Sequence, residues 1–427
     1  MNTTSRGILT TATGMLSQSR SLSQSRSLSR SRSLSLSLSR SQSQSQSRSL
    51  SQSQSQSRSL SQLLSRSRSQ SQPRLLSQSL SLSQLLSRSL LLLLSLSLSL
   101  SLCLSLAGCS PADYKIAFFI YKGSDTFITE LTEYMIENVP DGISFTLHDA
   151  GGSQAVQNQQ IVELIGNGYD LFIINAVDRL ACSSIMEKCE REGISVIFFN
   201  REPPQDALMG SNIYYIGIAP DNQGEKQAEI AASLFGENFA RSRYDRNNDG
   251  IVQVAIIKGE QGHQDAEKRT DSCISRLRSL GYQVEVLTIS VADWERQKGY
   301  DAMRGFYSQF SEDIELLFCN NDDMAVGAID YLLGTGVYSP GGKEGLPFPI
   351  IGVDGTRVGL EVIEKGYLYG TVQNDKIGQA DAILTLTQYI IEGKSMDDFP
   401  YLIADDHFIY IDGDVITQEN AADYIES

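Results

Sequence analysis

A short polar run beginning at Gly262 holds residue types that could bind a polyhydroxylated ligand. The run GHQDAEKR, residues 262–269, follows the apolar stretch Ile251–Ile257 and is expected where a strand passes into a helix. The spacing of Asp265 and Arg269 places both side chains on one helix face, and open α/β sheets hold ligands at the carboxyl ends of their strands. A sugar hydroxyl both donates and accepts, so an imidazole, a carboxylate and a guanidinium together suit it. An ordinary surface ion pair is the alternative for this run taken alone.

The elements that must position these residues form two series of alternating strands and helices. The first series has expected strands at residues 115–121, 144–148, 171–175 and 195–200, with helices near 125–138, 153–167 and 179–193. The second has expected strands at residues 252–258, 283–287, 315–319, 350–354 and 367–372, again with helices between them. Each series predicts a parallel sheet covered on both faces. The fold class is therefore α/β, with two Rossmann-like lobes and a break near residues 214–218.

Polar side chains recur where the predicted strands end. They are Asp125, Asn175, His263, Asp265, Arg269, Asn321, Asp354 and Asn374. Two aromatic residues accompany them, Phe127 and the only tryptophan, Trp294, which is expected to open a helix. Amides and carboxylates beside aromatic rings are typical of sugar sites, because the C–H face of a pyranose packs on a ring while its hydroxyls bond to polar groups. Each Asp or Asn taken singly could instead be a helix N-cap, but their recurrence favours a ligand site.

Six short segments have the residue order of a known family. They are IYKGSDTF (120–127), FNREP (199–203), KGEQGHQDAEKR (258–269), NNDDM (320–324), GVD (352–354) and GTVQN (370–374). They resemble the periplasmic galactose/glucose-binding proteins that serve ABC transporters and chemotaxis, and the resemblance extends from Lys115 to the C-terminus. It implies the type I periplasmic binding protein fold, in which two lobes close about a hinge. It places the family's sugar ligands on the eight polar residues named above and its stacking rings on Phe127 and Trp294. It further implies that Asp125 binds the 4-hydroxyl and tolerates both epimers, which would admit glucose and galactose.

A second constellation lies in the loop DRNNDGIVQ, residues 245–253. Oxygen-bearing side chains stand at the first, third, fifth and ninth positions with glycine at the sixth, as in an EF-hand calcium loop, but Ile256 stands where an EF-hand has glutamate. The family resemblance supplies that glutamate as Glu315. It implies one structural calcium ion held by Asp245, Asn247, Asp249, the Ile251 carbonyl, Gln253 and Glu315. A hydrophilic turn without metal is the alternative.

The N-terminal part of the chain differs in composition from the rest. Residues 1–89 contain a serine repeat, strict from Ser17 to Ser61, whose partners are too mixed to form a core, so we expect this segment to be disordered. In residues 90–109 an apolar stretch follows Arg88 and ends in LAGC, which resembles a bacterial lipobox with Cys109 as the lipidated residue. These features predict export, with the protein either lipid-anchored on the outer face of the cytoplasmic membrane or periplasmic.

The remaining residues set the expected domains and exclude some functions. We expect an N-terminal lobe from residues 113–217 plus 374–408 and a C-terminal lobe from residues 218–373 plus 409–427. All 51 acidic residues follow residue 109, which argues against nucleic acid as a partner. The four cysteines beyond Cys109 form no CxxC pair, and the seven-residue spacing of Cys182 and Cys189 along a helix is too long for a disulfide.

The function expected from these observations is extracytoplasmic binding of a glucose- or galactose-type monosaccharide. Lobe closure would deliver the sugar to the membrane subunits of an ABC permease, with a chemoreceptor as a further partner, and no enzymatic activity is expected. The alternatives are a cell-surface sensor that presents the closed form to a signalling receptor, a transcription regulator, for which no helix-turn-helix is found, and a glycosidase using Asp265 and Asp354. A glycosidase needs a carboxyl of raised pKa, whereas Arg269 and the amides are expected to keep these groups ionised.

Overall fold

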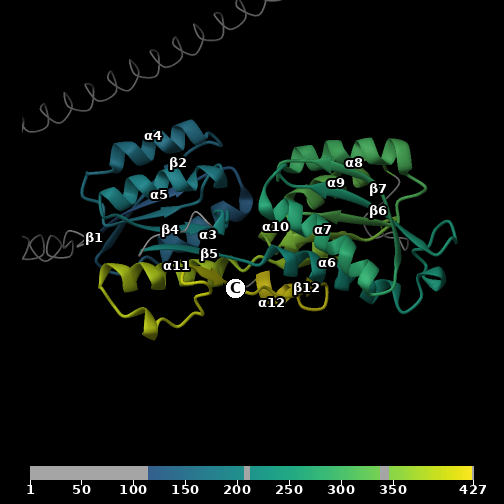
Figure 1. Cartoon of the computed structure of the whole chain (residues 1–427). Helices are drawn as coiled ribbons and strands as arrows, with labels where there is room; N and C mark the ends of the chain where they lie inside the picture. The colour runs from purple at the N-terminus through teal and green to yellow at the C-terminus, as the bar shows by residue number, and fades with distance from the viewer. Residues whose placement is uncertain (1–113, 206–211, 337–345, 426–427) are drawn as a thin grey trace, which may run out of the picture. The chain divides into compact units, whose positions relative to one another are not determined.

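Two six-stranded sheets form the core of the chain. The computed structural model describes residues 114–205, 212–336 and 346–425, which all lie within one unit spanning residues 106–427 (Figure 1). The predicted serine repeat, the export signal and Cys109 lie outside the described residues. Among the residues described, no helix has both the length and the apolar character needed to cross a bilayer.

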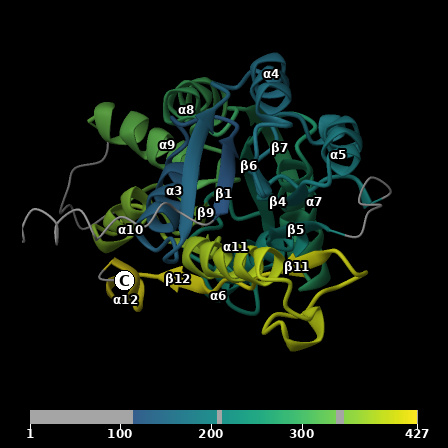
Figure 2. The same cartoon turned by 90° about the vertical axis from the view of Figure 1, so that its left-hand side faces the viewer.

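The first sheet is parallel throughout. It contains β1 (Tyr114–Ile120), β2 (Ile143–Asp149), β3 (Leu171–Ile174), β4 (Ser195–Phe199), β5 (Ile213–Gly217) and β11 (Phe408–Tyr410), in the order β11-β5-β4-β3-β1-β2. Helices α3 (Thr126–Glu137) and α11 (Lys376–Ile391) cover one face, and α4 (Gln154–Leu164) and α5 (Cys182–Arg191) cover the other (Figure 2). Along β1, Ile116 and Phe118 pack on the first face and Ala117 and Phe119 on the second, because side chains alternate along a strand.

The second sheet repeats this plan with one reversed edge strand. It contains β6 (Ile251–Lys258), β7 (Gln283–Val291), β8 (Leu316–Cys319), β9 (Ile350–Asp354), β10 (Gly370–Gln373) and β12 (Val415–Thr417), in the order β12-β10-β9-β8-β6-β7. Only β12 runs antiparallel to its neighbour among these strands. Helices α6 (Pro220–Phe235) and α7 (Gln264–Ser279) cover one face; α8 (Arg296–Phe310), α9 (Asp322–Gly334), α10 (Arg357–Glu364) and α12 (Ala421–Ile425) cover the other.

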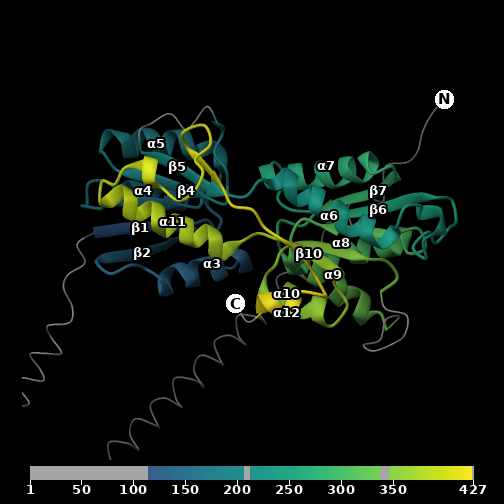
Figure 3. The ribbon, with the colours of Figure 1, turned by 90° about the horizontal axis from the view of Figure 1, so that it is seen from below.

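The chain passes between the two sheets three times. These passages follow β5, β10 and β11, so that each lobe is completed by a segment from late in the sequence (Figure 3). The lobe boundary expected after residue 408 falls inside β11, which runs to Tyr410 and pairs with β5. Every strand predicted from the sequence overlaps an observed one, whereas β5, β11 and β12 were not predicted as strands.

The four cysteines of the described residues are buried free thiols. Cys182 and Cys189 pack in the core under α5, and Cys319 ends the buried strand β8 as expected. Burial raises the pKa of Cys182 and of Cys189 to about 12. Neutral thiols without access to solvent are poor nucleophiles, so none of these residues marks a reactive site.

Candidate ligand-binding site

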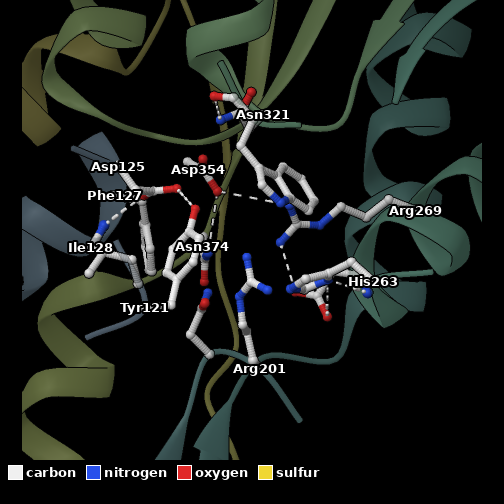
Figure 4. A pocket seen from close by; sticks show the side chains of 13 residues that line it. Tyr121, Asp125, Phe127, Ile128, Arg201, His263, Arg269, Asn321, Asp354 and Asn374 are labelled. Carbon is white, nitrogen blue, oxygen red and sulfur yellow. Dashed lines mark hydrogen bonds and ion pairs between the residues drawn. The ribbon is translucent and has the colours of Figure 1, made fainter. Parts of the chain in front are cut away.

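A cavity lies at the carboxyl ends of the strands and has walls from both lobes. It encloses about 340 Å³ of space free of protein atoms, part of it open to solvent. Nine of the ten predicted sugar-binding residues line it: Asp125, Phe127, His263, Asp265, Arg269, Trp294, Asn321, Asp354 and Asn374. The strand-end pattern therefore identified residues that the fold brings together (Figure 4).

Several of these residues are helix N-caps as well as cavity residues. Asp125 caps α3 through Oδ1, which accepts from the backbone N–H of Ile128 at 3.0 Å, while its Oδ2 accepts from the Tyr121 hydroxyl at 2.6 Å. Asn321 caps α9 in the same way, accepting from Met324 N at 3.0 Å. The two readings weighed from the sequence, N-cap and ligand, are thus compatible, because capping fixes the side chain at the cavity wall.

Arg269 makes four polar contacts in the part of the cavity wall that the second lobe contributes. Its guanidinium donates to Gln223 Oε1 at 2.7 Å, to the Asn320 carbonyl at 2.7 Å and to Asp265 Oδ2 at 3.3 Å, and it lies 4.0 Å from Asp354 Oδ1. Asp265 and Arg269 are four residues apart on α7, as the spacing predicted, and both are almost fully buried. Four fixed partners hold this guanidinium rigidly, so it can present a donor without reorganising.

Two aromatic side chains from different lobes face the same cavity. Phe127 lies in the first turn of α3 and belongs to the first lobe's core. Trp294 precedes α8, which begins at Arg296, so it does not open the helix as expected; it takes a left-handed backbone with φ of 66°. Its ring rests on Gly259, where an added Cβ would come within 2.2 Å of the indole. The His263 ring stands edge-on to it, with centroids 5.1 Å apart.

His263 is a neutral hydrogen-bonding group in this site. Burial, and then the charges of Arg201 and Arg269, hold its pKa well below the ordinary value. Its Nδ1 accepts from the backbone N–H of Asp265 at 3.2 Å, which assigns the ring proton to Nε2. The imidazole can therefore donate one hydrogen bond into the cavity.

Two carboxyl groups of the cavity, Asp265 and Asp354, have raised pKa values. Burial raises the pKa of Asp265 to about 6 and that of Asp354 well above its usual range, although Arg269 acts in the opposite direction on both. Arg269 and the amides therefore do not fully offset burial, although a pKa of about 6 still leaves Asp265 ionised at neutral pH. Desolvation dominates because both side chains are at least nine-tenths removed from solvent.

Asn175 is the one predicted ligand that does not line the cavity. It is fully buried behind the wall, where Oδ1 accepts from Tyr121 N at 3.2 Å and Nδ2 donates to the Phe199 carbonyl and to Asn200 Oδ1. In this arrangement Asn175 supports two residues of the wall, Tyr121 and Asn200, from the end of β3.

Four cavity residues were not singled out from the sequence: Tyr121, Ile128, Asn200 and Arg201. Asn200 and Arg201 directly follow β4, so the strand-end pattern could have found them. The Arg201 guanidinium stacks 3.8 Å from the Tyr121 ring centre and donates to the Val177 carbonyl at 2.7 Å. It also pairs with Glu260 of the second lobe at 2.8 Å, so it connects the two walls.

The predicted calcium loop folds as a tight turn leading into β6. Asp245, Asn247 and Asp249 accept from backbone N–H groups within the turn, which includes left-handed residues at Asn248 and Gly250. Ile256 is buried in β6, as expected. Among the described residues, no three His, Cys, Asp or Glu side chains stand close enough together to hold a metal ion.

Glu315 is nevertheless directed at this loop. It is fully buried, and its two oxygens accept from Arg246 N at 2.6 Å and from Gln253 N at 3.1 Å. The Gln253 Oε1 atom is buried without a hydrogen-bond partner. Oxygen donors of this kind, one of them unsatisfied, are chemically suited to a hard cation such as calcium.

Comparisons with known proteins agree with this architecture. A family model described as a periplasmic binding protein domain matches residues 116–395. The chain is 32% identical over 320 residues to the D-galactose/methyl-galactoside binding periplasmic protein of Haemophilus influenzae, covering 74% of this chain and 93% of that protein. It is 27% identical to a ribose import binding protein of Bacillus subtilis, covering 56% and 69% respectively. A solved ABC transporter solute-binding protein of Bacillus halodurans with bound myo-inositol superposes with a TM-score of 0.60 at 24% identity, covering 74% of this chain and 99% of that one.

Proposed function

Because this chain belongs to the periplasmic binding protein family, we propose that it is an extracytoplasmic receptor for a glucose- or galactose-type monosaccharide. The observation that carries the proposal is the cavity wall, in which Phe127 and Trp294 face the same space from different lobes beside three carboxyl groups and a fixed guanidinium. Polar groups around the edge and rings at the faces suit a pyranose better than an apolar or anionic ligand. The 32% identity to a galactose-binding relative supports a hexose over a pentose.

The same contacts suggest how binding would be signalled. Side chains of the first lobe reach the second at several places. Three of them are Arg201 to Glu260, Lys122 to Glu295 at 2.9 Å, and Arg179 to Gln264 at 2.6 Å. A ligand that contacts both walls would favour the arrangement in which these contacts form, since it binds that arrangement better. The closed form would then be recognised by ABC permease subunits, with a chemoreceptor as a second partner.

A fluorescence titration against a panel of monosaccharides tests this proposal. Trp294 is the only tryptophan in the chain and lines the cavity, so sugar binding should change the emission. We expect saturable changes with glucose or galactose and weaker ones with ribose. Absence of a response to every hexose in the panel, checked by calorimetry, would refute the proposal.

Replacing Asp125 by alanine should weaken hexose binding without unfolding the protein. The substitution removes an acceptor at the cavity wall and leaves the Tyr121 hydroxyl without its 2.6 Å partner. We expect a loss of about 1–3 kcal/mol in binding free energy, the usual cost of an unsatisfied buried polar group. Calorimetry measures it, and Asp149→Ala, an exposed carboxylate at the end of β2, is the control. Unchanged affinity would remove Asp125 from the site.

Binding should weaken as the pH falls through about 6. The pKa of Asp265 is raised to about 6 by burial, and a hydroxyl donating to this group needs the ionised form. Protons and sugar therefore compete below that pKa, so the affinity should fall by up to about tenfold per pH unit below pH 6 and stay level above about pH 7. In Asp265→Asn this dependence should be weaker, and the remainder should come from Asp354, whose pKa burial also raises. A flat wild-type profile from about pH 8 to about pH 5 would contradict the assignment.

Two alternatives have their own tests. A sensor that presents its closed form to a signalling receptor would bind the same sugars. Deletion of the ABC permease subunits would leave the cell's response to sugar intact if the protein is such a sensor. A glycosidase is the less favoured alternative, although the raised pKa values of Asp265 and Asp354 leave a proton donor available. Incubation with aryl galactosides would reveal turnover, whereas a binding protein should release none of the aryl group.

We also propose a structural calcium ion and a lipid anchor for this protein. The calcium proposal rests on the oxygen-rich loop, the unpartnered Gln253 Oε1 and the buried Glu315 carboxylate. Asp245, Asn247, Asp249, the Ile251 carbonyl, Gln253 and Glu315 would hold the ion. The anchor at Cys109 rests on the sequence alone, and intact mass spectrometry of the native protein, which would detect an N-terminal diacylglyceryl group, tests it.

A further inference from the structure

One carboxyl group at the start of α9 is completely buried and does not line the sugar cavity. Asp322 is the first residue of α9, directly after Asn321, and has no surface exposed to solvent. Burial raises its pKa, and hydrogen bonds from Thr371 and Thr356 act against the rise. A buried ionisable group often contributes no more stability than an apolar side chain of similar size. Stability alone therefore does not explain a carboxyl group at this position.

Asp322 joins three segments of the second lobe. Its Oδ2 accepts from the backbone N–H of Thr356 at 2.9 Å and from the Thr356 hydroxyl at 3.3 Å. Its Oδ1 accepts from the hydroxyl of Thr371 in β10 at 2.7 Å. Asp322 thereby ties α9 to β10 and to the turn between β9 and α10, in which Thr356 is the N-cap of α10.

Two glycines make room for this carboxyl group. An added Cβ at Gly352 in β9 would lie 2.3 Å from Asp322 Oδ1, and one at Gly359 in α10 would lie 2.3 Å from Asp322 Oδ2. A side chain at either position would push the carboxyl group away from its hydrogen-bond donors. The neighbouring strand and helix therefore fit the side chain of Asp322 closely.

The turn that Asp322 holds begins at a cavity residue with a strained backbone. Asp354 ends β9 and lines the sugar cavity (Figure 4). Its φ is 124°, which residues other than glycine rarely adopt, and Gly355 follows with φ of 68°. Such conformations persist only where surrounding contacts over-determine them. The Asp354 carbonyl accepts from Asn374 N at 3.0 Å, and two residues further on Asp322 holds Thr356, so contacts fix the turn at both ends.

The cavity residue next to Asp322 in the chain has anchors of its own. Asn321 accepts from Met324 N at 3.0 Å and donates to the Trp294 carbonyl at 3.2 Å. Asp322 takes part in neither contact. The link from Asp322 to the cavity is therefore the turn at Asp354.

We propose that Asp322 is a positioning residue for sugar binding, which holds the turn from Asp354 to Thr356 so that the Asp354 carboxyl group faces the ligand. This role rests on the proposed sugar-binding function and adds to it a residue that does not touch the sugar. Asp322 acts through hydrogen bonds to the turn, so its effect on binding depends on Asp354.

Calorimetry with the hexose that the wild-type protein binds most tightly tests this role. Asp322→Ala removes both acceptor atoms and should weaken hexose binding by about 10- to 100-fold, the usual effect of leaving buried polar groups unsatisfied. Asp322→Asn should keep the affinity within about threefold, because an amide can accept from Thr356 N through its oxygen and donate to the Thr371 hydroxyl oxygen through its nitrogen.

A double-mutant cycle separates positioning from general stabilisation of the lobe. In the Asp354→Asn background, Asp322→Ala should weaken binding by less than about twofold more, because residues that act through one contact are not additive. In the Phe127→Leu background, the loss from Asp322→Ala should stay at about 10- to 100-fold, since Phe127 lies in the first lobe and its ring makes no hydrogen bond. A loss of lobe stability alone would affect both backgrounds equally.

Thr371→Val tests the same link should Asp322→Ala fail to fold. The substitution nearly keeps the side chain's shape and removes the hydroxyl that donates to Asp322, so hexose affinity should fall by about three- to tenfold. Thr387→Val is the matched control. Thr387 is a fully buried threonine of α11 outside the sugar cavity, and its hydroxyl has no hydrogen-bond partner among the described residues, so affinity should stay within about twofold.

Three results would overturn this role for Asp322. The first is hexose affinity within about twofold of wild type in a folded Asp322→Ala protein or, if that variant does not fold, in Thr371→Val. The second is an equal loss with and without Asp354→Asn, and the third is a loss in Asp322→Asn as large as in Asp322→Ala. A wild-type protein that binds no hexose would instead refute the proposed function, so the two failures are distinguishable.

Discussion

Trp294→Ala should lower hexose affinity more than any other single change in the cavity. In the proposed site the indole of Trp294, which lines the cavity from the second lobe, would stack on the ligand. Tryptophans at binding sites typically contribute about 2–4 kcal/mol, which corresponds to a roughly 30- to 700-fold weaker Kd when they are removed. The ring is held by Gly259 beneath it and by His263 at its edge. Removing it also frees the His263 side chain, so both stacking and hydrogen bonding should suffer.

The measurement is calorimetry, since Trp294→Ala leaves no tryptophan to report binding. Trp294→Phe keeps a flat ring and should recover most of the affinity. Tyr300→Ala is the matched control, because Tyr300 is a half-buried aromatic residue of α8 that packs on Tyr331 outside the cavity. Tight hexose binding by Trp294→Ala would show that the ligand does not occupy this cavity.

The strand-end pattern predicted much of this site because parallel strands share one carboxyl edge. Asp125 follows β1, Asp354 ends β9 and Asn374 follows β10, so sequence positions far apart meet at one place. Strand prediction succeeded for long strands such as β1 and β6. It missed β5, although this strand is apolar and fully buried, because its residues were interpreted as the break between the lobes. It failed for β11 and β12, because three residues are too few to show an alternating or a continuous apolar pattern.

The features that were not predicted depend on contacts between distant segments. Arg201 follows β4 closely enough for the strand-end pattern to find it, but its contacts with Tyr121 and Glu260 could not be predicted without the fold. The pKa of Asp265 could not be read from its neighbour Arg269, because burial outweighs that charge. Asn175 has the expected residue type at the expected strand end, yet its amide is satisfied inside the first lobe.

Calcium removal should produce the largest effect on stability, and its size should depend on pH. Without the ion, burial raises the pKa of Glu315 to about 7, well above its value of about 4.3 in an unfolded chain. The folded state then binds the proton more tightly, so stability is retained below about pH 4.3 and is lost as the pH rises through about 7. The proposed calcium ion would bind the ionised carboxylate of Glu315. It should therefore offset this loss of stability at pH values above about 7, where Glu315 is ionised.

Chelation should therefore lower the Tm by several degrees at about pH 8 and by much less at about pH 5.5, since an ion present at about 100 times its Kd stabilises by about 2.7 kcal/mol. Glu315→Gln should abolish the response. Glu312→Gln should keep it, because Glu312 is 89% exposed and only reaches Arg246 at 3.6 Å. Equal Tm values with calcium and with chelator at about pH 8 would contradict the proposed calcium site. The loop would then be held only by the hydrogen bonds that Asp245, Asp249 and Glu315 accept from backbone N–H groups.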